Sequence, residues 1–242
     1  MKLSYKLIWL ASFIFGLAVL LSGCQHAEST PISTPTVTPS PEQMDKSMFV
    51  GTPCLAPCWY GLEVGKSKER DVISVLPTLI FINQNSVQMH RRPSVPNYYS
   101  MAAGPGVQIV ANCINSDKEC IDLSIADDIL QKIIVRLNYE IRPEEAIAFL
   151  GAPDYVGYND LSSEMPMCEV YLVWRNSRLV LATRFEDYDG LEKYCYVVRD
   201  EGKVPASLQI SEARFLSEPE LDFLLETDAL SFFGFTGLLV EK

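Results

Sequence analysis

The chain has 242 residues, of which 48% are hydrophobic, 21% charged and 10% aromatic, and its formal net charge is −11. This composition excludes a wholly disordered chain, a collagen-like repeat and a multi-pass membrane protein. The acidity argues against nucleic acid as a partner. The two histidines, His26 and His90, are too few for a histidine-rich catalytic or metal site.

The first residues have the pattern of an export signal. Met1 to Lys6 form a short positive segment, and Leu7 to Leu21 are almost uniformly apolar. A membrane-spanning helix needs about 20 residues, so this shorter run is typical of a secretory signal. The run ends in Leu21-Ser22-Gly23-Cys24, which resembles the lipobox of bacterial lipoproteins.

The lipobox resemblance implies that diacylglycerol is attached to the thiol of Cys24 and that the chain is cleaved after Gly23. Residues 1–23 would then be a signal peptide. Two or three acyl chains anchor a protein stably where one does not. We therefore expect an extracytoplasmic protein held by its N-terminal lipid in the cell membrane or envelope. The alternative is an uncleaved anchor with an accidental cysteine.

A tether follows the cysteine. Ser29 to Pro41 consists almost entirely of Ser, Thr and Pro, with Ile32 and Val37 as the apolar exceptions. Such a segment cannot bury a core and leans towards an extended polyproline conformation. At ~3.1 Å per residue, it would hold a domain roughly 40 Å from the bilayer. We assign residues 24–47 to this tether and 48–242 to an extracytoplasmic domain.

The other six cysteines predict disulfides. An even number in an exported chain indicates three bridges, although the sequence leaves all connectivities open. Local spacing favours Cys54–Cys58, Cys113–Cys120 and Cys168–Cys195. A redox pair at Cys54 and Cys58, or a zinc site that adds Cys113 and Cys120, are the competing interpretations.

Three short helices are predicted in the domain. The first is capped by Ser67 and stopped by Pro77, and the second runs from Pro143 to a C-terminal Gly151. The third begins at Ser217, which can form a capping box with Glu220. Its expected buried stripe is Leu221, Leu224 and Leu225.

Strand patterns dominate the rest of the domain. Alternating or β-branched runs are followed by turn residues such as Asp127-Asp128 and Arg175-Asn176-Ser177, which predict hairpins. Hairpins imply an α+β domain with an antiparallel sheet and a few short helices on one face. The expected strands are 107–113, 120–125, 132–137, 170–174, 178–185, 194–198 and 206–210.

A weak repeat relates the two halves of the domain. A shift of 75 residues places Ser67 on Arg142 and Val72 on Ile147, so a short helix precedes extended segments in each half, 48–138 and 139–242. Gly61 to Gly65 before the first helix, and Phe149-Leu-Gly-Ala-Pro153 after the second, resemble the helix-then-sheet modules of BamE/SmpA-type lipoproteins and of β-lactamase-inhibitor-like domains. The Pro57-Cys58-Trp59 motif also resembles exported lipoproteins that carry such modules. The resemblance implies a tandem α+β fold and no enzymatic activity.

The chain contains no sequence motif of nucleotide-dependent, serine-hydrolase or zinc-protease chemistry. Carboxylate clusters such as Asp127/Asp128, Glu144/Glu145 and Glu186/Asp187/Asp189 are better explained by turns and helix starts. Calcium at 187–190 is a minor alternative because further ligands are missing. We expect no cofactor and no metal. The alternative function is a cell-envelope hydrolase that uses Asp187 or Asp189.

The segment from Gln84 to Gly106 gathers basic and aromatic residues in an otherwise acidic protein. Arg and Tyr are enriched at interface hot spots. We therefore expect a surface loop that binds an envelope protein through Arg91, Arg92, Tyr98 and Tyr99. The predicted function is that of a lipid-anchored, non-catalytic binding or structural module.

Overall fold

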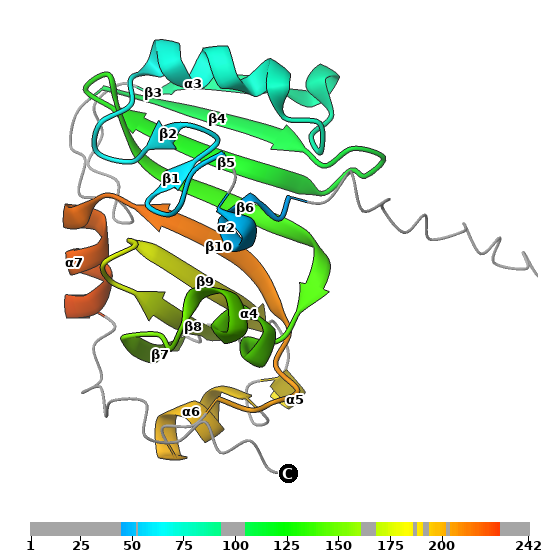
Figure 1. The fold of residues 1–242 in the computed structure, drawn as a ribbon, viewed down its shortest axis with the longest axis vertical. Coiled ribbons are helices and arrows are strands. Elements are labelled where there is room, and N and C mark those ends of the chain that lie inside the picture. The colour runs from blue at the N-terminus through cyan, green and yellow to red at the C-terminus, as the bar shows by residue number, and fades with distance from the viewer. Residues whose placement is uncertain are drawn as a thin grey trace, which may run out of the picture. The chain divides into compact units, whose positions relative to one another are not determined.

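The computed structural model describes residues 45–51, 53–92, 105–160, 168–185, 188–190, 194–201 and 204–227. Eight strands form one antiparallel sheet in the order β3-β4-β5-β6-β10-β9-β8-β7, which runs from the top to the bottom of Figure 1. The strands are β3 (Gln88–Arg92), β4 (Gly106–Asn112), β5 (Glu119–Ala126), β6 (Ile129–Ile141), β7 (Tyr155–Asp160), β8 (Cys168–Trp174), β9 (Leu179–Phe185) and β10 (Ile210–Leu216). A small hairpin pairs β1 (Cys58–Trp59) with β2 (Leu62–Glu63).

Short helices accompany the sheet, which confirms the α+β class. The α-helices are α2 (Ser47–Val50), α3 (Glu69–Val75), α4 (Pro143–Leu150), α5 (Tyr188–Gly190), α6 (Tyr196–Glu201) and α7 (Glu218–Thr227), and the 3-10 turns are η2 (Leu76–Thr78) and η3 (Gln84–Ser86).

The strand order is symmetric about the centre of the sheet. Helix α3 precedes the meander β3-β4-β5-β6, and α4 precedes the meander β7-β8-β9-β10. The last strands of the two meanders, β6 and β10, pair antiparallel in the middle, with Ala213 opposite Val135. Each half of the sheet therefore has a helix followed by four strands, and the second half also has α5 and α6 between β9 and β10.

One face of the sheet, which we call the helix face, carries the main core. Ile109 of β4, Leu123 of β5 and Ile133 of β6 are buried there, together with Val72 of α3 and Ala146 of α4. Burying a side chain of this size contributes about 1.5–3 kcal/mol. This core holds α3, α4 and the small hairpin on the same side of the sheet.

Helix α7 lies on the opposite face and departs from the one-face arrangement expected from the sequence. Successive strand residues point to opposite faces. Leu181 of β9 belongs to the main core, whereas its neighbour Val180 packs in a second cluster with Leu221 of α7. The predicted stripe Leu221, Leu224 and Leu225 indeed faces the protein. The part of the sheet under α7 is consequently covered on both faces.

Turn and cap residues explain where the elements begin and end. Asp127 and Asp128 both adopt positive φ between β5 and β6, as a two-residue type I′ hairpin turn requires. Pro143 opens α4 and Gly151 ends it at φ 79°, as predicted. Glu145 reaches back to accept a hydrogen bond from the backbone N–H of Arg142.

The other two caps differ from the sequence prediction. Helix α3 is capped at Lys68, because the Ser67 hydroxyl instead accepts a hydrogen bond from the Glu63 N–H. When α3 and α4 are matched by their N-caps, Lys68 and not Ser67 corresponds to Arg142. The Ser217 hydroxyl is buried without a hydrogen-bond partner among the described residues, so the expected capping box is not formed there.

Several strand assignments also change. The sequence predicts an extended segment at residues 194–198, but helix α6 begins at Tyr196. In this helix the Arg199 guanidinium lies 4.2 Å from the Tyr196 ring centroid. Residues 206–210 lead into β10 rather than forming a strand themselves. Strands β3 and β7 lie where no strand was predicted. Tertiary contacts outweigh intrinsic strand propensity in these short segments.

Candidate functional site

The face of the sheet opposite the helix face, which we call the polar face, differs between the two halves. In β4 the buried residues of the core alternate with the half-buried Gln108 and Val110 on the polar face. The amide of Gln108 donates a 2.8 Å hydrogen bond to one oxygen of Asp122 on β5. The other Asp122 oxygen is buried and has no hydrogen-bond partner among the described residues. The first half thus presents polar groups on this face.

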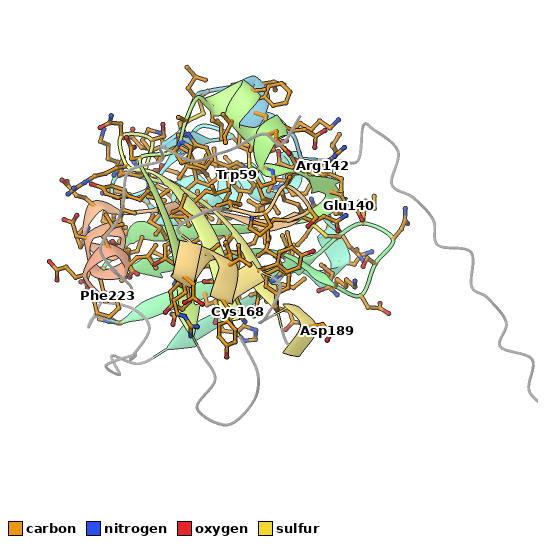
Figure 2. The ribbon with its side chains drawn as sticks, turned by 90° about the horizontal axis from the view of Figure 1, so that it is seen from below. Trp59, Glu140, Arg142, Cys168, Asp189 and Phe223 are labelled. Atoms are coloured by element: carbon orange, nitrogen blue, oxygen red, sulfur yellow. A yellow bond between two sulfur atoms is a disulfide. The ribbon has the colours of Figure 1, made fainter. Side chains whose placement is uncertain are left out.

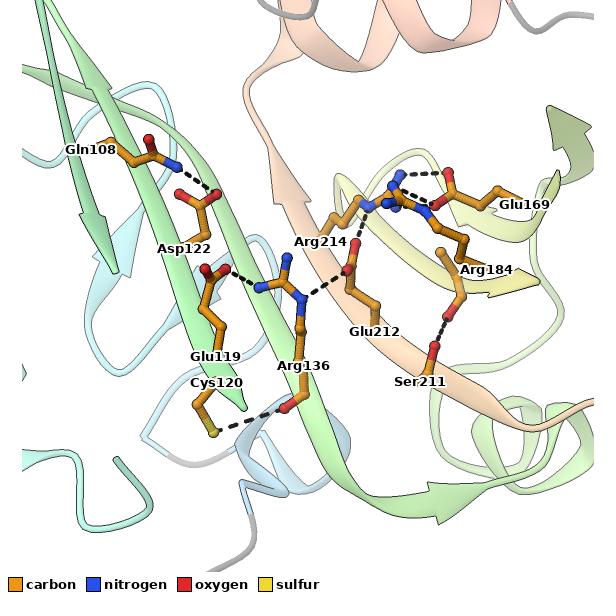
Figure 3. Close-up of polar contacts among 11 residues, drawn as sticks. Gln108, Glu119, Cys120, Asp122, Arg136, Glu169, Arg184, Ser211, Glu212 and Arg214 are labelled. Atoms are coloured by element: carbon orange, nitrogen blue, oxygen red, sulfur yellow. Dashed lines mark hydrogen bonds and ion pairs between the residues drawn. The ribbon is translucent and has the colours of Figure 1, made fainter. Parts of the chain in front are cut away.

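A ladder of alternating charges crosses the middle of the polar face (Figure 3). Arg136 of β6 lies between Glu119 of β5 and Glu212 of β10, which pairs in turn with Arg214 of the same strand. Arg214 then reaches across to Glu169 of β8. Each charge in the ladder has a neighbour of opposite sign, so the ladder joins the two halves of the sheet by ion pairs.

The ion pair of Arg214 and Glu169, at the end of the ladder in the second half of the sheet, is buried. The side chains of Arg214 and Glu169 are 13% and 7% exposed, and one of their hydrogen bonds measures 2.9 Å. Burial disfavours the charged guanidinium, but Glu169 and Glu212 outweigh that cost and raise the pKa of Arg214. Such a pair is strongly interdependent, because removing one partner leaves an uncompensated buried charge.

A second polar cluster holds the first described residues against the rest of the domain. Asp45, only 3% exposed, accepts a 2.7 Å hydrogen bond from the indole N–H of Trp59, and its backbone carbonyl accepts one from the Tyr139 hydroxyl. Trp59 lies among the packed side chains in Figure 2. Burial and Asp45 raise the pKa of both Tyr60 and Tyr139. The folded part therefore includes Asp45 to Ser47, three residues of the tether predicted from the sequence.

The six domain cysteines form the three pairs that local spacing favours: Cys54–Cys58, Cys113–Cys120 and Cys168–Cys195. Their Cα atoms lie 5.7, 4.6 and 6.5 Å apart, within the usual range. A zinc site would require free thiolates, so this pairing argues against that interpretation. Cys24, the expected lipidation site, lies outside the described residues.

The predicted partner-binding residues are only partly placed. Arg91 and Arg92 belong to edge strand β3 and not to a loop. The Arg91 guanidinium forms a 2.7 Å ion pair with Glu69 at the start of α3. Tyr98 and Tyr99 lie outside the described residues.

The candidate catalytic carboxylates are not gathered into a site among the described residues. Asp127 and Asp128 form a hairpin turn, and Asp189 is exposed at the periphery of the molecule (Figure 2). Glu186 and Asp187 lie outside the described residues. Within the described part of the chain, no group of three His, Cys, Asp or Glu residues is placed to hold a metal ion. No described helix is long and apolar enough to cross a membrane.

The charge ladder was missed in the sequence. Arg136 could have been found, because it alternates with Val135 and Leu137, which the pattern already places on one face. Glu212 and Arg214 could not, because the strand that carries them was predicted to end at residue 210. Pairing across strands far apart in the chain leaves no local signal.

In comparisons with known proteins, no protein-family model, no curated protein and no solved structure is significantly similar to this chain.

Proposed function

We propose that this chain is a lipid-anchored, extracytoplasmic module of the cell envelope that binds a partner protein and performs no chemistry. The lipobox at Leu21 to Cys24 supports the anchor, and three disulfides are typical of an oxidising, exported environment. The tandem BamE/SmpA-like or β-lactamase-inhibitor-like relationship stays a prediction from the sequence.

One observation carries the binding function. Gln88, Met89, His90 and Arg91 of the edge strand β3 are all exposed, although their side chains alternate between the two faces of the sheet. The strand also carries three consecutive basic or titratable residues, 90–92, in a chain of net charge −11. This edge is exposed, its charge is opposite in sign to the net charge of the chain, and it belongs to a disulfide-bonded domain. These properties favour recognition of a partner.

The charged residues of the sheet also favour binding over catalysis. A hydrolase that relies on carboxylates needs an acid and a base held free to exchange protons with a substrate. Glu119, Glu169 and Glu212 each form an ion pair with an arginine of another strand instead. Their geometry serves cross-strand pairing.

The anchor is tested with Cys24→Ser in the full chain. We expect the variant to lose fatty-acid labelling and either to leave the membrane fraction or to accumulate as a precursor. Normal labelling and fractionation of the variant would contradict the lipid anchor.

The binding function is tested by site-specific photocrosslinking in intact cells. A photoreactive residue at His90 should yield a covalent adduct of one defined mass, whereas the same residue at exposed Glu218 of α7 should not. The proposal would be overturned if His90 gave no adduct while Asp187→Asn or Asp189→Asn removed a measurable hydrolysis of cell-wall material.

A further inference from the structure

Among the described residues, strand β3 pairs with another strand on only one side. Five of its residues pair with β4, from Gln88 opposite Val110 to Arg92 opposite Gly106, and no other described strand pairs with β3. In an antiparallel strand, N–H and C=O groups point alternately to the two neighbours. Half of the backbone groups of β3 are therefore directed away from the sheet, where another extended chain can bind them.

The two rows of side chains on β3 differ in chemistry. Gln88 and His90 lie on the polar face, opposite Val110 and Gln108. Met89 and Arg91 lie on the helix face, where Met89 remains 40% exposed. An added strand would therefore meet the polar Gln88 and His90 on one face, and the exposed Met89 with the cationic Arg91 on the other.

Helix α3 adds an exposed apolar side chain on the same face as Met89. Arg91 contacts Glu69 in the first turn of α3, which places this helix beside the edge strand. Ile73 lies one turn further along α3 and is 42% exposed. The exposed Ile73 and Met89 thus both lie on the helix face at this edge, where apolar side chains of an added strand would be accommodated.

The Arg91–Glu69 ion pair indicates what charge the edge attracts. Their nitrogen and oxygen atoms are 2.7 Å apart, and the Arg91 side chain is 69% exposed. The Glu69 side chain is 19% exposed. A pair that water screens on its arginine side is worth only about 1 kcal/mol, so Arg91 can exchange this carboxylate for another one. The rest of the chain is acidic, which leaves β3 as a basic strip in a negative field.

From these observations we propose that β3 accepts an extended, acidic segment of a partner protein as an additional antiparallel strand. The inference rests on the proposed binding function and specifies its mode: backbone hydrogen bonds to β3, carboxylates beside His90 and Arg91, and apolar side chains beside Met89 and Ile73. A second copy of this chain is a poorer occupant, because two β3 strands would place like charges against each other.

The test uses the full chain in detergent and, as the probe, a blocked, fluorescent decapeptide in which pairs of Val alternate with pairs of Glu, so that each face of the added strand carries both residue types. Fluorescence anisotropy should show saturable binding that weakens with added salt, and no binding of the matched Val/Lys peptide. The double substitution His90→Glu and Arg91→Glu should weaken the binding about tenfold or more. Glu218→Lys, a charge change at an exposed residue of α7, serves as the control and should leave binding unchanged.

Two N-methylated probes isolate the backbone contribution. Only alternate residues of an added strand bond to β3. N-methylation of one alternate set should therefore abolish binding, and N-methylation of the other set should preserve it, although the side chains are the same. Amide hydrogen exchange of residues 88–92 should slow when the unmethylated peptide is bound.

Other outcomes would overturn strand addition. Equal binding of both methylated probes, or binding without slower exchange at residues 88–92, would show recognition by side chains alone or at another surface. Slow exchange at β3 that depends on protein concentration without peptide would show that a second copy occupies the edge. A defined photoadduct at His90 together with either result would retain the binding function and reject only this mode.

Discussion

The two halves of the sheet share one order of strands but differ in how they are covered. In the second half, β8 is buried at every residue, and α7 covers the polar face through Leu221. In the first half, β4 alternates between buried and half-buried residues, and β3 is exposed on both faces. We infer that the second half serves as a rigid frame, whereas the first half keeps an edge available for a partner.

The charge ladder shows the same contrast at the level of single residues. Glu169 in the second half is 7% exposed, whereas Glu119 in the first half is 36% exposed, and both pair with arginine. Water screens the first of these carboxylates much less than the second. The same type of contact should therefore have unequal consequences in the two halves.

The largest effect is expected for Glu169→Ala. This substitution leaves the buried Arg214 guanidinium without its main partner and should lower the free energy of unfolding by about 3–5 kcal/mol. Glu119→Ala, the matched change at the exposed end, should cost about 0–1 kcal/mol. Urea denaturation of both variants measures the difference, and equal losses would contradict the contrast between the halves.

The disulfides give the next effect. Cys168–Cys195 closes a separation of 27 residues and Cys113–Cys120 one of 7. By loop-closure entropy, replacing the cysteines of the first pair with alanine should cost about 3.5 kcal/mol and those of the second pair about 2.4 kcal/mol. Thermal or urea unfolding of the two double variants tests this order. Titratable thiols in the unmodified folded domain would contradict the pairing itself.

Removal of the α7 contact should have a somewhat smaller effect. Leu221→Ala deletes a side chain that is 2% exposed against the second cluster and should cost about 3 kcal/mol. Ile73→Ala on α3, where the side chain is 42% exposed, is the matched control and should cost about 0.5 kcal/mol. A negligible loss for Leu221→Ala would show that α7 does not hold the polar face of the second half.

Alkaline pH provides the smallest expected effect. An unfolded tyrosine ionises near pH 10. Burial and the neighbouring Asp45 raise the pKa of Tyr139, so the folded state keeps a proton that the unfolded state loses. Stability should be retained below about pH 10 and fall above it, by at most about 1.4 kcal/mol per pH unit from this group.

Tyr139→Phe isolates this contribution. The variant should lose about 1 kcal/mol at neutral pH, because the hydroxyl no longer donates to the Asp45 carbonyl. Its stability should then decline less steeply than that of the parent protein between about pH 10 and pH 11.5. If the stability of the two proteins fell equally steeply above pH 10, Tyr139 would have the same pKa in the folded and the unfolded state.

Local signals were sufficient for much of the fold. Pro143 and Gly151 delimit α4 as expected, and Asp127-Asp128 joins two alternating strands. Strand β7 was not recognisable, because Gly157 interrupts its pattern. A Cβ atom at this position would lie 2.5 Å from the Tyr171 ring on β8, so the glycine is needed for a contact between strands. This reason for the glycine becomes visible only when the pairing of β7 with β8, which places Gly157 opposite Tyr171, is known.

The candidate site was less predictable than the fold. The basic run at Arg91 was identified as a candidate but assigned to a loop, because the run lacks the apolar alternation of a half-buried strand. An uncovered edge strand does not need that alternation. The buried pair of Glu169 and Arg214 joins two strands through tertiary pairing, for which no local pattern exists.

Amide hydrogen exchange across the whole sheet distinguishes a covered frame from an open edge. Exchange rates follow the free energy of local opening, which depends on burial and hydrogen bonding. We predict the slowest exchange in β8, β9 and β10, which form the covered frame, and the fastest in β3 of the free protein. Protection of β3 equal to that of β9 in the monomer would contradict the division into a frame and an open edge.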